Sequence, residues 1–505
     1  MSRSQFSPRA LRLSVLASAL VLAGCASTAV QPLPSDTLSK STAERRAAER
    51  AAVPPLGEQL TLQEALARAL KYNLDRRTKL MEEAIALNQL DVSRYEMWPK
   101  LVAAAGYSAR DNDRIVNTVD SRTGVTTLSN ALSSDRNHLL TDLGLTWNLL
   151  DFGLGYYNSR QQADRALVAL ERRRKAMHLL VQDVRSAYWR ALAAQQLQSE
   201  ITVAIRNADE ALADSRKSET ERLRSPLDSL RYQRQLLESL RLLEGIQQEL
   251  ASAKVELAQL INAPLDAGMR LADADAKPSE QLLAADIAKL ETLALSRNAE
   301  LRESSYNIRI AREEVHKAIA RSVPNISFSY NLKYDTDSFL VNQRWNEAGL
   351  QVSYNLFNLL TAPKTIKLAK TGVALAEQRQ LATMMSVVTQ VHLARLQYAN
   401  SVRQLARADD IWQVDARIAK VSAAREAAQA QSKLEVVASQ TTAIVSQLRR
   451  FQAIAQMQTA LARVHASVGL ELEVDGMASL PLPELTGRVE TAMHALDAAT
   501  EGKLQ

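Results

Sequence analysis

The side chains best suited to covalent or metal chemistry are few and far apart. Cys25 is the only cysteine in 505 residues, so no disulfide can form within the chain. The six histidines show no metal-ligand spacing; they are His138, His178, His316, His392, His465 and His494. Neither a glycine-rich phosphate loop nor a nucleophile elbow is present. We therefore expect no enzyme, no cofactor and no metal site.

The surroundings of Cys25 point to chemistry at its thiol. Three arginines precede an apolar run over 13–22, which has the form of a secretory signal and is too short to span a membrane. The run ends in Leu-Ala-Gly-Cys at 22–25, which resembles the bacterial lipobox. That resemblance implies a lipidated Cys25 after a cleaved signal peptide and, since no aspartate follows, sorting to the outer membrane. The alternative is a lone buried thiol.

Charge and composition exclude one large class of function. The chain has 62 Lys and Arg against 56 Asp and Glu, a net charge of +6. The excess is spread along the sequence and is not clustered with aromatic residues, so we expect no nucleic-acid partner. The densest basic run, 172–175, is interpreted as a solvated helix face; contact with lipopolysaccharide, a partner or the lumen contents is the alternative. Residues 25–58 contain four prolines and are predicted to form an extended, lipidated tether.

The sequence contains an internal duplication. Residues 73–99 match 298–324 at a constant offset of 225, and Trp147-Asn148-Leu149 corresponds to Tyr354-Asn355-Leu356 at an offset of 207. The second offset holds as far as Ile261 and Val468. The 18-residue difference predicts one insertion, which we place in a loop around 112–136. Such a long repeat is a duplicated architectural unit rather than a solenoid.

Each copy contains two short segments in which apolar and polar residues alternate. These segments are 101–110, 143–149, 326–334 and 350–356. Alternation predicts strands with one apolar face, and their length suits a tilted strand crossing a bilayer. We expect the lipid-facing residues to include Leu145, Trp147, Phe328 and Val352. We expect Thr146, Ser327 and Ser353 to face a lumen. A soluble hairpin resting on a core is the alternative.

Long helices follow the strands. No proline interrupts 156–222, and apolar residues in this segment and in 243–260 recur every three and four positions, as in coiled coils. Such a helix would be roughly 100 Å long at about 1.5 Å per residue. A fibrous dimer or a spectrin-like bundle would show the same periodicity. Four strands cannot enclose a lumen, so a barrel would require strands from several chains.

The turns between the long helices are predicted just before Ser225 and Ser432. Each serine is followed three residues later by an acid, Asp228 or Glu435, which is a capping-box pattern. Helix capping is the simpler role of these acids. The second possible role is a gate, in which Arg224 or Arg231 pairs with an acid on a neighbouring hairpin.

Taken together, these features resemble the TolC family of outer-membrane factors, especially its lipoprotein branch. The matching motifs are Leu-Thr-Leu-Gln-Glu-Ala-Leu at 60–66 with Asn73, Trp98-Pro99, Val323-Pro324, Leu227-Asp228 and Leu434-Glu435. The resemblance covers roughly 60–470. Two features depart from the family pattern: the tips lack a glycine, and Ala438 stands where a second gate acid is usual.

The resemblance implies a mixed α and transmembrane β fold. Three copies would share a barrel with four strands per chain, continued by a periplasmic α-helical coiled-coil tunnel with an equatorial collar. The partners would be two further copies, a periplasmic adaptor, an inner-membrane transporter and outer-membrane lipid. The implied function is a passive exit duct for small molecules in a tripartite efflux pump. A duct for type I protein secretion and a non-conducting, lipid-anchored scaffold are the alternatives.

The expected domain boundaries follow from the duplication. The signal peptide covers 1–24, the tether 25–58 and the first repeat 59–262. A connector over 263–283 precedes the second repeat, 284–470, and 471–505 form an equatorial segment and a tail, part of which is expected to be disordered.

Overall fold

The computed structural model describes most of the chain. The described residues are 32–119, 122–221, 225–265, 268–274, 277–430, 432–472, 474, 476–477 and 479–499. The chain divides into two units, Met1–Pro55 and Leu56–Gln505. Each unit is treated by itself. Cys25 and Arg224 lie outside the described residues.

The first unit contains helix α2 (Ser35–Ala52), so the expectation of an extended tether is wrong for these residues. Alanine, arginine and glutamate fill the stretch between the prolines, and all three favour helix. Pro34 is the N-cap residue, and Val53 is extended because Pro54 disfavours a helical conformation before it. The prolines therefore bound the helix and do not extend the segment.

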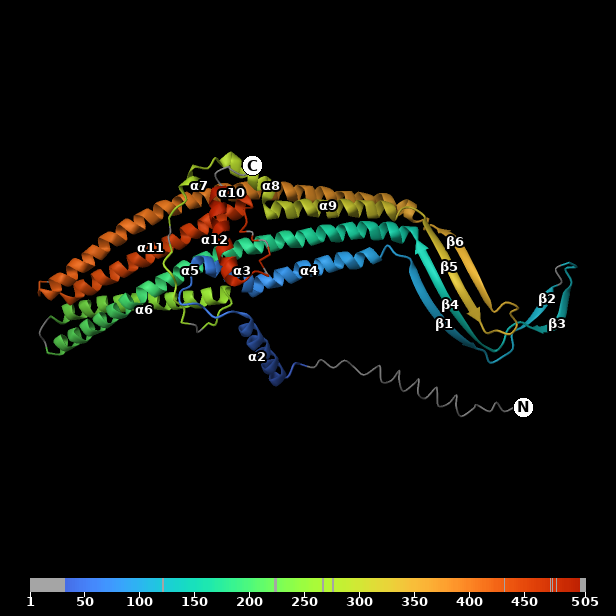
Figure 1. Cartoon of the computed structure of the whole chain (residues 1–505), viewed down its shortest axis with the longest axis horizontal. Coiled ribbons are helices and arrows are strands. Elements are labelled where there is room, and N and C mark those ends of the chain that lie inside the picture. The colour runs from blue at the N-terminus through green and yellow to red at the C-terminus, as the bar shows by residue number, and fades with distance from the viewer. Residues whose placement is uncertain are drawn as a thin grey trace. The chain divides into compact units, whose positions relative to one another are not determined.

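The second unit carries one four-stranded antiparallel sheet at its far end (Figure 1). Its strands, in spatial order, are β1 (Lys100–Ala109), β4 (Asn137–Asn148), β5 (Asn325–Asp335) and β6 (Arg344–Ser353). Trp147 pairs with Phe328, which pairs with Leu350 on its other side. Directly opposed residues share a face, so the register confirms one apolar and one polar face.

The predicted insertion lies between β1 and β4. That connection spans 110–136, whereas the connection between β5 and β6 spans only 336–343. The longer connection forms a separate two-stranded ribbon of β2 (Ile115–Val119) and β3 (Thr126–Leu132), which projects beyond the sheet in Figure 1. The sequence located the insertion but did not reveal that it pairs as strands.

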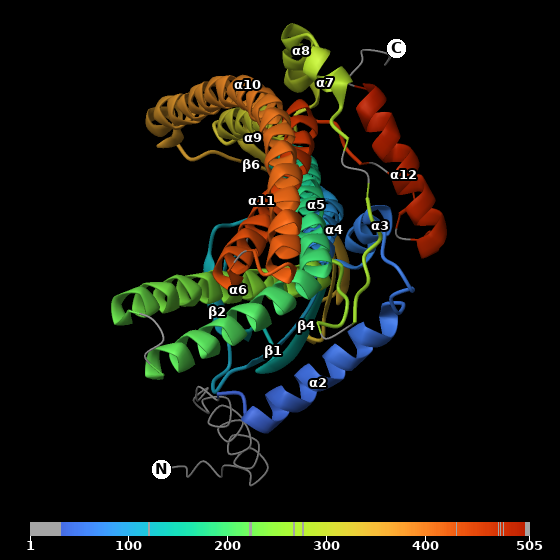
Figure 2. The same ribbon diagram turned by 90° about the vertical axis from the view of Figure 1, so that its left-hand side faces the viewer.

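Two very long helices leave the sheet. Helix α5 (Leu149–Thr220) has 72 residues, and α10 (Asn358–Ala427) has 70. Their return helices are α6 (Pro226–Leu260) and α11 (Lys433–Val468), which begin where the sequence predicts. Viewed from the tips (Figure 2), α5 pairs with α6 and α10 with α11.

Two shorter helices complete a wall beside the long ones. Helix α4 (Leu74–Tyr95) packs on α5, and α9 (Ala299–Ala320) packs on both α5 and α10. The helical order α4, α5, α9, α10 therefore matches the strand order β1, β4, β5, β6. Among the described residues, no helix is both long and apolar enough to cross a membrane.

Equivalent residues mark the joints of the two repeats and confirm the duplication. Asn73 and Asn298 are both buried, and each accepts a backbone hydrogen bond at the start of the next helix. Their amide groups donate to the carbonyls of Leu260 and Ser467, each 3.0 Å away. Each asparagine thus ties a short helix to the end of a return helix.

A middle belt lies along one side of the long helices, between the sheet and the tips (Figures 1 and 2). We use this name for α3 (Leu62–Tyr72), α7 (Glu280–Ala284), α8 (Ile287–Arg297) and α12 (Leu482–Ala499). Helix α12 packs on α3 and buries Leu485 and Val489 fully. Residues Leu482–Ala499 of the C-terminal stretch form a helix because its apolar face is covered by the belt; the expectation that part of 471–505 is disordered stays a prediction.

Candidate functional site

The apolar face of the sheet is the first feature with functional meaning. Trp147, Phe328 and Leu350 lie in one row across three strands, and Leu350 is 74% exposed. The register places the expected lipid-facing residues on this face and the expected lumen-facing residues on the other. An exposed apolar sheet face of this size is unstable in water and marks a surface that contacts lipid or protein.

The sheet also has two open edges. Among the described residues, β1 pairs only with β4, and β6 pairs only with β5. Tyr107 on β1 and Val352 on β6 are 70% and 64% exposed. Each edge presents unpaired N–H and C=O groups along ten residues, and natural proteins cover such edges or protect them with charge or proline.

The outer helices continue these edges with apolar side chains. On α4 and α10, which flank the wall, several large apolar residues are exposed: Met81, Ile85, Val92, Leu360, Leu368, Leu375 and Met385. Within the described chain, α4 has few neighbours besides α5, and the side of α10 away from α9 and α11 is uncovered. The apolar surface thus follows both edges of the wall.

The inner seam of the wall, between α5 and α9, is instead ionic. Arg160 pairs with Glu313 at 3.0 Å, Arg309 with Asp164 at 2.7 Å, and Arg302 with Glu171 at 3.0 Å. The three carboxylates are at most 5% exposed. Burial raises the pKa of Asp164 despite the nearby Arg309 guanidinium.

The basic run 172–175 contributes to this ionic system. Its interpretation as a solvated face holds for Arg172 and Lys175, whose side chains are 62% and 52% exposed, and is wrong for Arg173 and Arg174, which are 22% and 15% exposed. Each cation has a carboxylate partner: Arg172 with Glu303, Arg173 with Glu83, Arg174 with Glu171 and Glu471, and Lys175 with Glu300. Helix α5 lies between α4 and α9, so partners surround it. Sequence periodicity could not reveal these pairs because the partners are up to about three hundred positions away.

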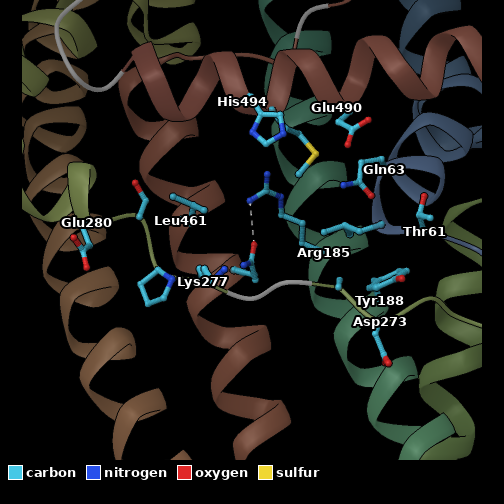
Figure 3. Close-up of a pocket in the computed structure, with 16 residues that line it drawn as sticks. Thr61, Gln63, Arg185, Tyr188, Asp273, Lys277, Glu280, Leu461, Glu490 and His494 are labelled. Carbon is cyan, nitrogen blue, oxygen red and sulfur yellow. Dashed lines mark hydrogen bonds between the residues drawn. The ribbon is translucent and has the colours of Figure 1, made fainter.

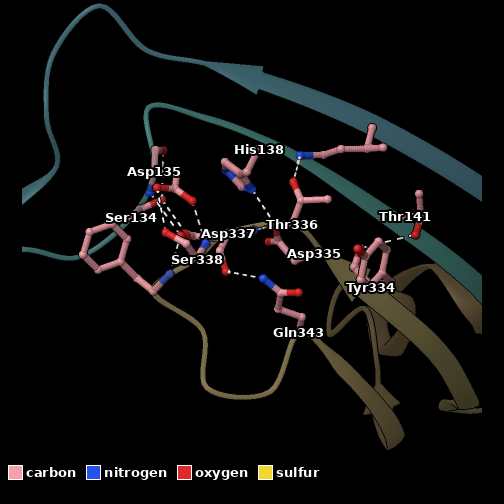
Figure 4. A network of polar contacts seen from close by, with 12 residues as sticks. Ser134, Asp135, His138, Thr141, Tyr334, Asp335, Thr336, Asp337, Ser338 and Gln343 are labelled. Atoms are coloured by element: carbon pink, nitrogen blue, oxygen red, sulfur yellow. Dashed lines mark hydrogen bonds and ion pairs between the residues drawn. The ribbon is translucent and has the colours of Figure 1, made fainter.

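At the outer end of the sheet, a polar network joins the two hairpin connections (Figure 4). The Asp337 carboxylate accepts hydrogen bonds from the Ser134 hydroxyl at 2.7 Å and the Asp135 N–H at 3.0 Å. In return, the Asp135 carboxylate accepts from the Ser338 N–H at 2.6 Å. The Ser134 hydrogen bond is the main cause that lowers the pKa of Asp337. This network fixes the base of the β2–β3 ribbon against the β5–β6 connection.

The tips contain most of the site residues expected from the sequence. Ser432 and Glu435 close a capping box, with both hydrogen bonds at 3.4 Å. Ser225 is the N-cap residue of α6, but its side chain makes no capping hydrogen bond, so the predicted box is wrong there. The Asp228 side chain is one methylene shorter than that of glutamate, which the box prefers. Instead, its carboxylate lies 4.0 Å from the guanidinium of Arg231 on the same exposed turn.

One tip contact was not expected from the sequence. The Lys433 ammonium lies 3.0 Å from the Asp214 carboxylate, which joins the first turn of α11 to α5. The hydrogen bond that Lys433 donates to the Asp214 carboxylate raises the pKa of Lys433. Among the described contacts, none joins Asp228 to Glu435.

A cavity of about 860 Å³ lies in the middle belt, between the long helices, the connector and α12 (Figure 3). The buried Arg185 side chain donates to Gln458 at 3.3 Å in its wall. Nearby, burial lowers the pKa of His465 to about 3 and that of His178 to about 4. These imidazoles are therefore neutral at physiological pH, and the described residues contain no cluster that could hold a metal ion.

Comparisons with known proteins match this geometry to solved structures. No family model matches the chain, and no curated protein matches it. The Campylobacter jejuni CmeC outer membrane channel has a TM-score of 0.63 at 13% identity, over 85% of this chain and 89% of that one. The Vibrio cholerae outer membrane protein VceC has 0.60 at 12%, over 82% and 97%. The Neisseria gonorrhoeae MtrE outer membrane channel has 0.59 at 16%, over 81% and 89%. The fold class predicted from the sequence is confirmed.

Proposed function

We propose that this chain, which has the fold of the TolC-like outer-membrane channels, is the exit duct of a tripartite efflux pump. Three copies would close one barrel in the outer membrane and one helical tunnel in the periplasm. Small molecules would pass through it passively, driven by an inner-membrane transporter and connected through a periplasmic adaptor.

One observation carries this proposal: among the described residues, the sheet is open at both edges and has one face that is largely apolar. In lipid, every backbone N–H and C=O must be paired, so a sheet can span a membrane only as a closed barrel. Four strands cannot enclose a lumen. Completion by further copies solves both problems, because β1 of one copy can cover β6 of another.

The polar face then lines the duct. Thr146 and Ser329 are opposed on that face, as are Ser327 and Gln351. These groups are uncharged and can hydrate the lumen, and Asp142, Lys333 and Glu347 add charged side chains to the same face. Such a polar lining supports a hydrated conduit for small molecules.

The anchor of the duct is proposed at Cys25, with the tether leading to the second unit. Lipidation would remove its free thiol and hold the N-terminus at the membrane. Mass spectrometry of the mature N-terminus tests this directly. We expect a diacylated or triacylated Cys25 in the native protein and none after Cys25→Ser; an unmodified, unprocessed Cys25 would contradict the lipoprotein assignment.

The tips are proposed as the gated end and the contact site of the adaptor. Asp228, Arg231 and Glu435 are exposed there, so single ion pairs would be weak and closure would need several around the assembly. Arg224 is included by sequence position alone. The variant Asp228→Asn with Glu435→Gln keeps similar side-chain shapes and deletes the charge. We expect the channel formed by this variant to open more readily and to lose cation selectivity. Unchanged conductance and selectivity would mean that helix capping is the only role of Glu435.

The conduit itself is tested by the conductance of the purified protein in liposomes. We expect stepwise currents from the wild type and none from Leu145→Arg, which places a charge on the apolar face and should prevent insertion. A wild-type protein that inserts into the bilayer and never conducts would overturn the duct and favour a lipid-anchored scaffold.

A further inference from the structure

The two sequence offsets of the duplication reproduce the pairing of the hairpins. In the first hairpin, Lys100 is opposite Thr146, and in the second, Asn325 is opposite Ser353. Adding 225 to the first strand and 207 to the second converts every pair of the β1–β4 ladder into a pair of the β5–β6 ladder. The offsets therefore describe equivalent positions in space as well as in sequence.

The same offsets can be applied to the pair that joins the two repeats. Within the chain, β4 of the first repeat pairs with β5 of the second, with Leu143 opposite Leu332. The equivalents of β4 and β5 are β6 and β1. These two strands lie at opposite edges of the sheet, so in the proposed barrel they meet only between different copies.

We propose that β6 of one copy pairs with β1 of the next in the register of the internal β4–β5 pair, and that this register seats the apolar loop tip 339–341 against the base of the next copy's β2–β3 ribbon. The offsets place Leu350 opposite Tyr107 and Val352 opposite Ala105 of the next copy. This inference rests on the proposed multi-chain barrel and specifies the surfaces that close it.

The chemistry of the two edges agrees with that register. Leu350 and Tyr107 lie on the apolar faces of their strands, because they share rows with Phe328 and Leu139. A slip of one residue would oppose each apolar side chain to the polar face. On the polar face, the register sets Glu347 opposite Arg110 of the next copy, a pair of opposite charges.

The contact should continue past the ends of the strands. Inside the chain, the Thr336 N–H donates to the Leu139 carbonyl at 3.1 Å, and Ser338 bonds to Asp135. By the same offsets, Asp135 corresponds to Asn342, and Ser338 corresponds to Asp113 of the next copy. The β5–β6 connection of one copy would therefore lie beside the start of β2 in the next.

Apolar side chains are exposed on both sides of that predicted contact. On the loop tip, Phe339, Leu340 and Val341 are 46%, 38% and 98% exposed. At the ribbon base, Ile115, Val116 and Leu132 are 52%, 36% and 49% exposed. The polar network already holds each loop against its own ribbon on one side. Loops and ribbons would thus alternate around the outer rim, each loop held between two ribbons.

Thiol cross-linking tests the register in the full-length chain, whose only native cysteine is Cys25. A short bifunctional thiol reagent is applied to the Val352→Cys, Ala105→Cys protein in membranes. Opposed residues on paired strands lie within reach of such a reagent, whereas diagonal residues are farther apart. We expect a shift from the one-chain band to a closed three-chain band on a denaturing gel.

Matched controls move one partner by two residues on the same face. Val352→Cys is combined with Ala103→Cys or with Tyr107→Cys, and both combinations should stay mainly in the one-chain band. If a displaced pair links instead, the register is overturned and the closed assembly stands. If no pair links although the native mass shows several chains, the β6–β1 contact is overturned. A native mass of one chain would instead overturn the proposed barrel itself.

The loop tip is tested separately. Val341→Cys with Val116→Cys should link neighbouring copies, whereas Val341→Cys with Val125→Cys, at the far end of the ribbon, should not. Linking of the strand pair without the Val341–Val116 pair would confirm the register and overturn the seat of the loop tip.

Discussion

Within the chain, the two repeats meet along α5 and α9 through ion pairs whose carboxylates are buried and whose guanidinium groups are about half-exposed, whereas the outer helices α4 and α10 present apolar side chains. The duplication makes these two surfaces equivalent. The offsets convert the pair Arg160–Glu313 into Lys367 and Asn88, and the pair Arg309–Asp164 into Ala84 and Thr371. Neither pair of equivalent residues can form an ion pair, because each lacks a carboxylate.

The same correspondence shows what replaces the charges. Gln161 on α5 donates to the Ile310 carbonyl on α9 at 3.0 Å. Their equivalents are Leu368 and Ile85, which are 74% and 56% exposed. A polar contact inside the chain thus corresponds to two exposed apolar side chains, which would meet between copies in the proposed assembly.

The difference has a physical reason. Buried ion pairs are poor sources of net stability because desolvation offsets their attraction, but they penalise a wrong partner strongly. They suit a seam whose helices must find each other during folding. Apolar edges suit association of folded chains, because their burial costs no desolvation of charge.

Breaking the ionic seam should have the largest effect. Glu171→Ala would leave the half-exposed Arg302 without its buried carboxylate and Arg174 with Glu471 alone, at a cost of about 3 kcal/mol in the free energy of unfolding, the lower end of the usual range because neither arginine becomes a buried, unpaired charge. Glu303→Ala, which removes the partner of the exposed Arg172, should cost under about 1 kcal/mol. Denaturant unfolding followed by circular dichroism measures both free energies. Equal losses of stability would contradict the difference between the buried carboxylate of Glu171 and the exposed pair of Arg172 and Glu303.

A charge on the apolar sheet face should have an effect of similar size. Tyr330→Arg should cost about 2–4 kcal/mol near the bilayer midplane, whereas the neighbouring Ser329→Arg faces the lumen and should cost far less. The folded fraction in lipid vesicles, read from heat-modifiable gel mobility, compares the two. Similar losses for both variants would mean that the faces are misassigned.

Weakening an apolar edge should alter assembly and leave folding intact. Leu368→Ser should destabilise each contact between copies by about 1–3 kcal/mol, the value of one buried leucine. Leu295→Ser, on an exposed position of α8, is the matched control. Dilution in detergent followed by light scattering should show earlier dissociation only for Leu368→Ser, with unchanged helix content. A dissociation curve that matches the wild type would contradict a role for this edge.

The smallest effect is expected at the tips. Ser432→Ala removes a capping box and should cost about 1 kcal/mol, whereas Ser225→Ala removes no capping bond and should cost almost nothing. Hydrogen exchange at the first turns of α11 and α6 would report the difference locally. Faster exchange at α6 after Ser225→Ala would contradict the description of that tip.

The sequence revealed the features that depend on local pattern. The alternating segments, the helix starts at Pro226 and Lys433 and the place of the insertion all follow from short-range signals. The helix Ser35–Ala52 was missed because its bounding prolines resemble those of a linker. The α5–α9 ion pairs could not be predicted, because they depend on which helices become neighbours.

The open edges of the sheet are proposed to be completed by other copies of the chain. Native mass spectrometry of the protein purified in mild detergent measures this. We expect one dominant species with three times the mass of the mature chain, and no stable one-chain species under the same conditions. A folded protein with unchanged helix and strand content that remains a single chain would contradict completion by other copies.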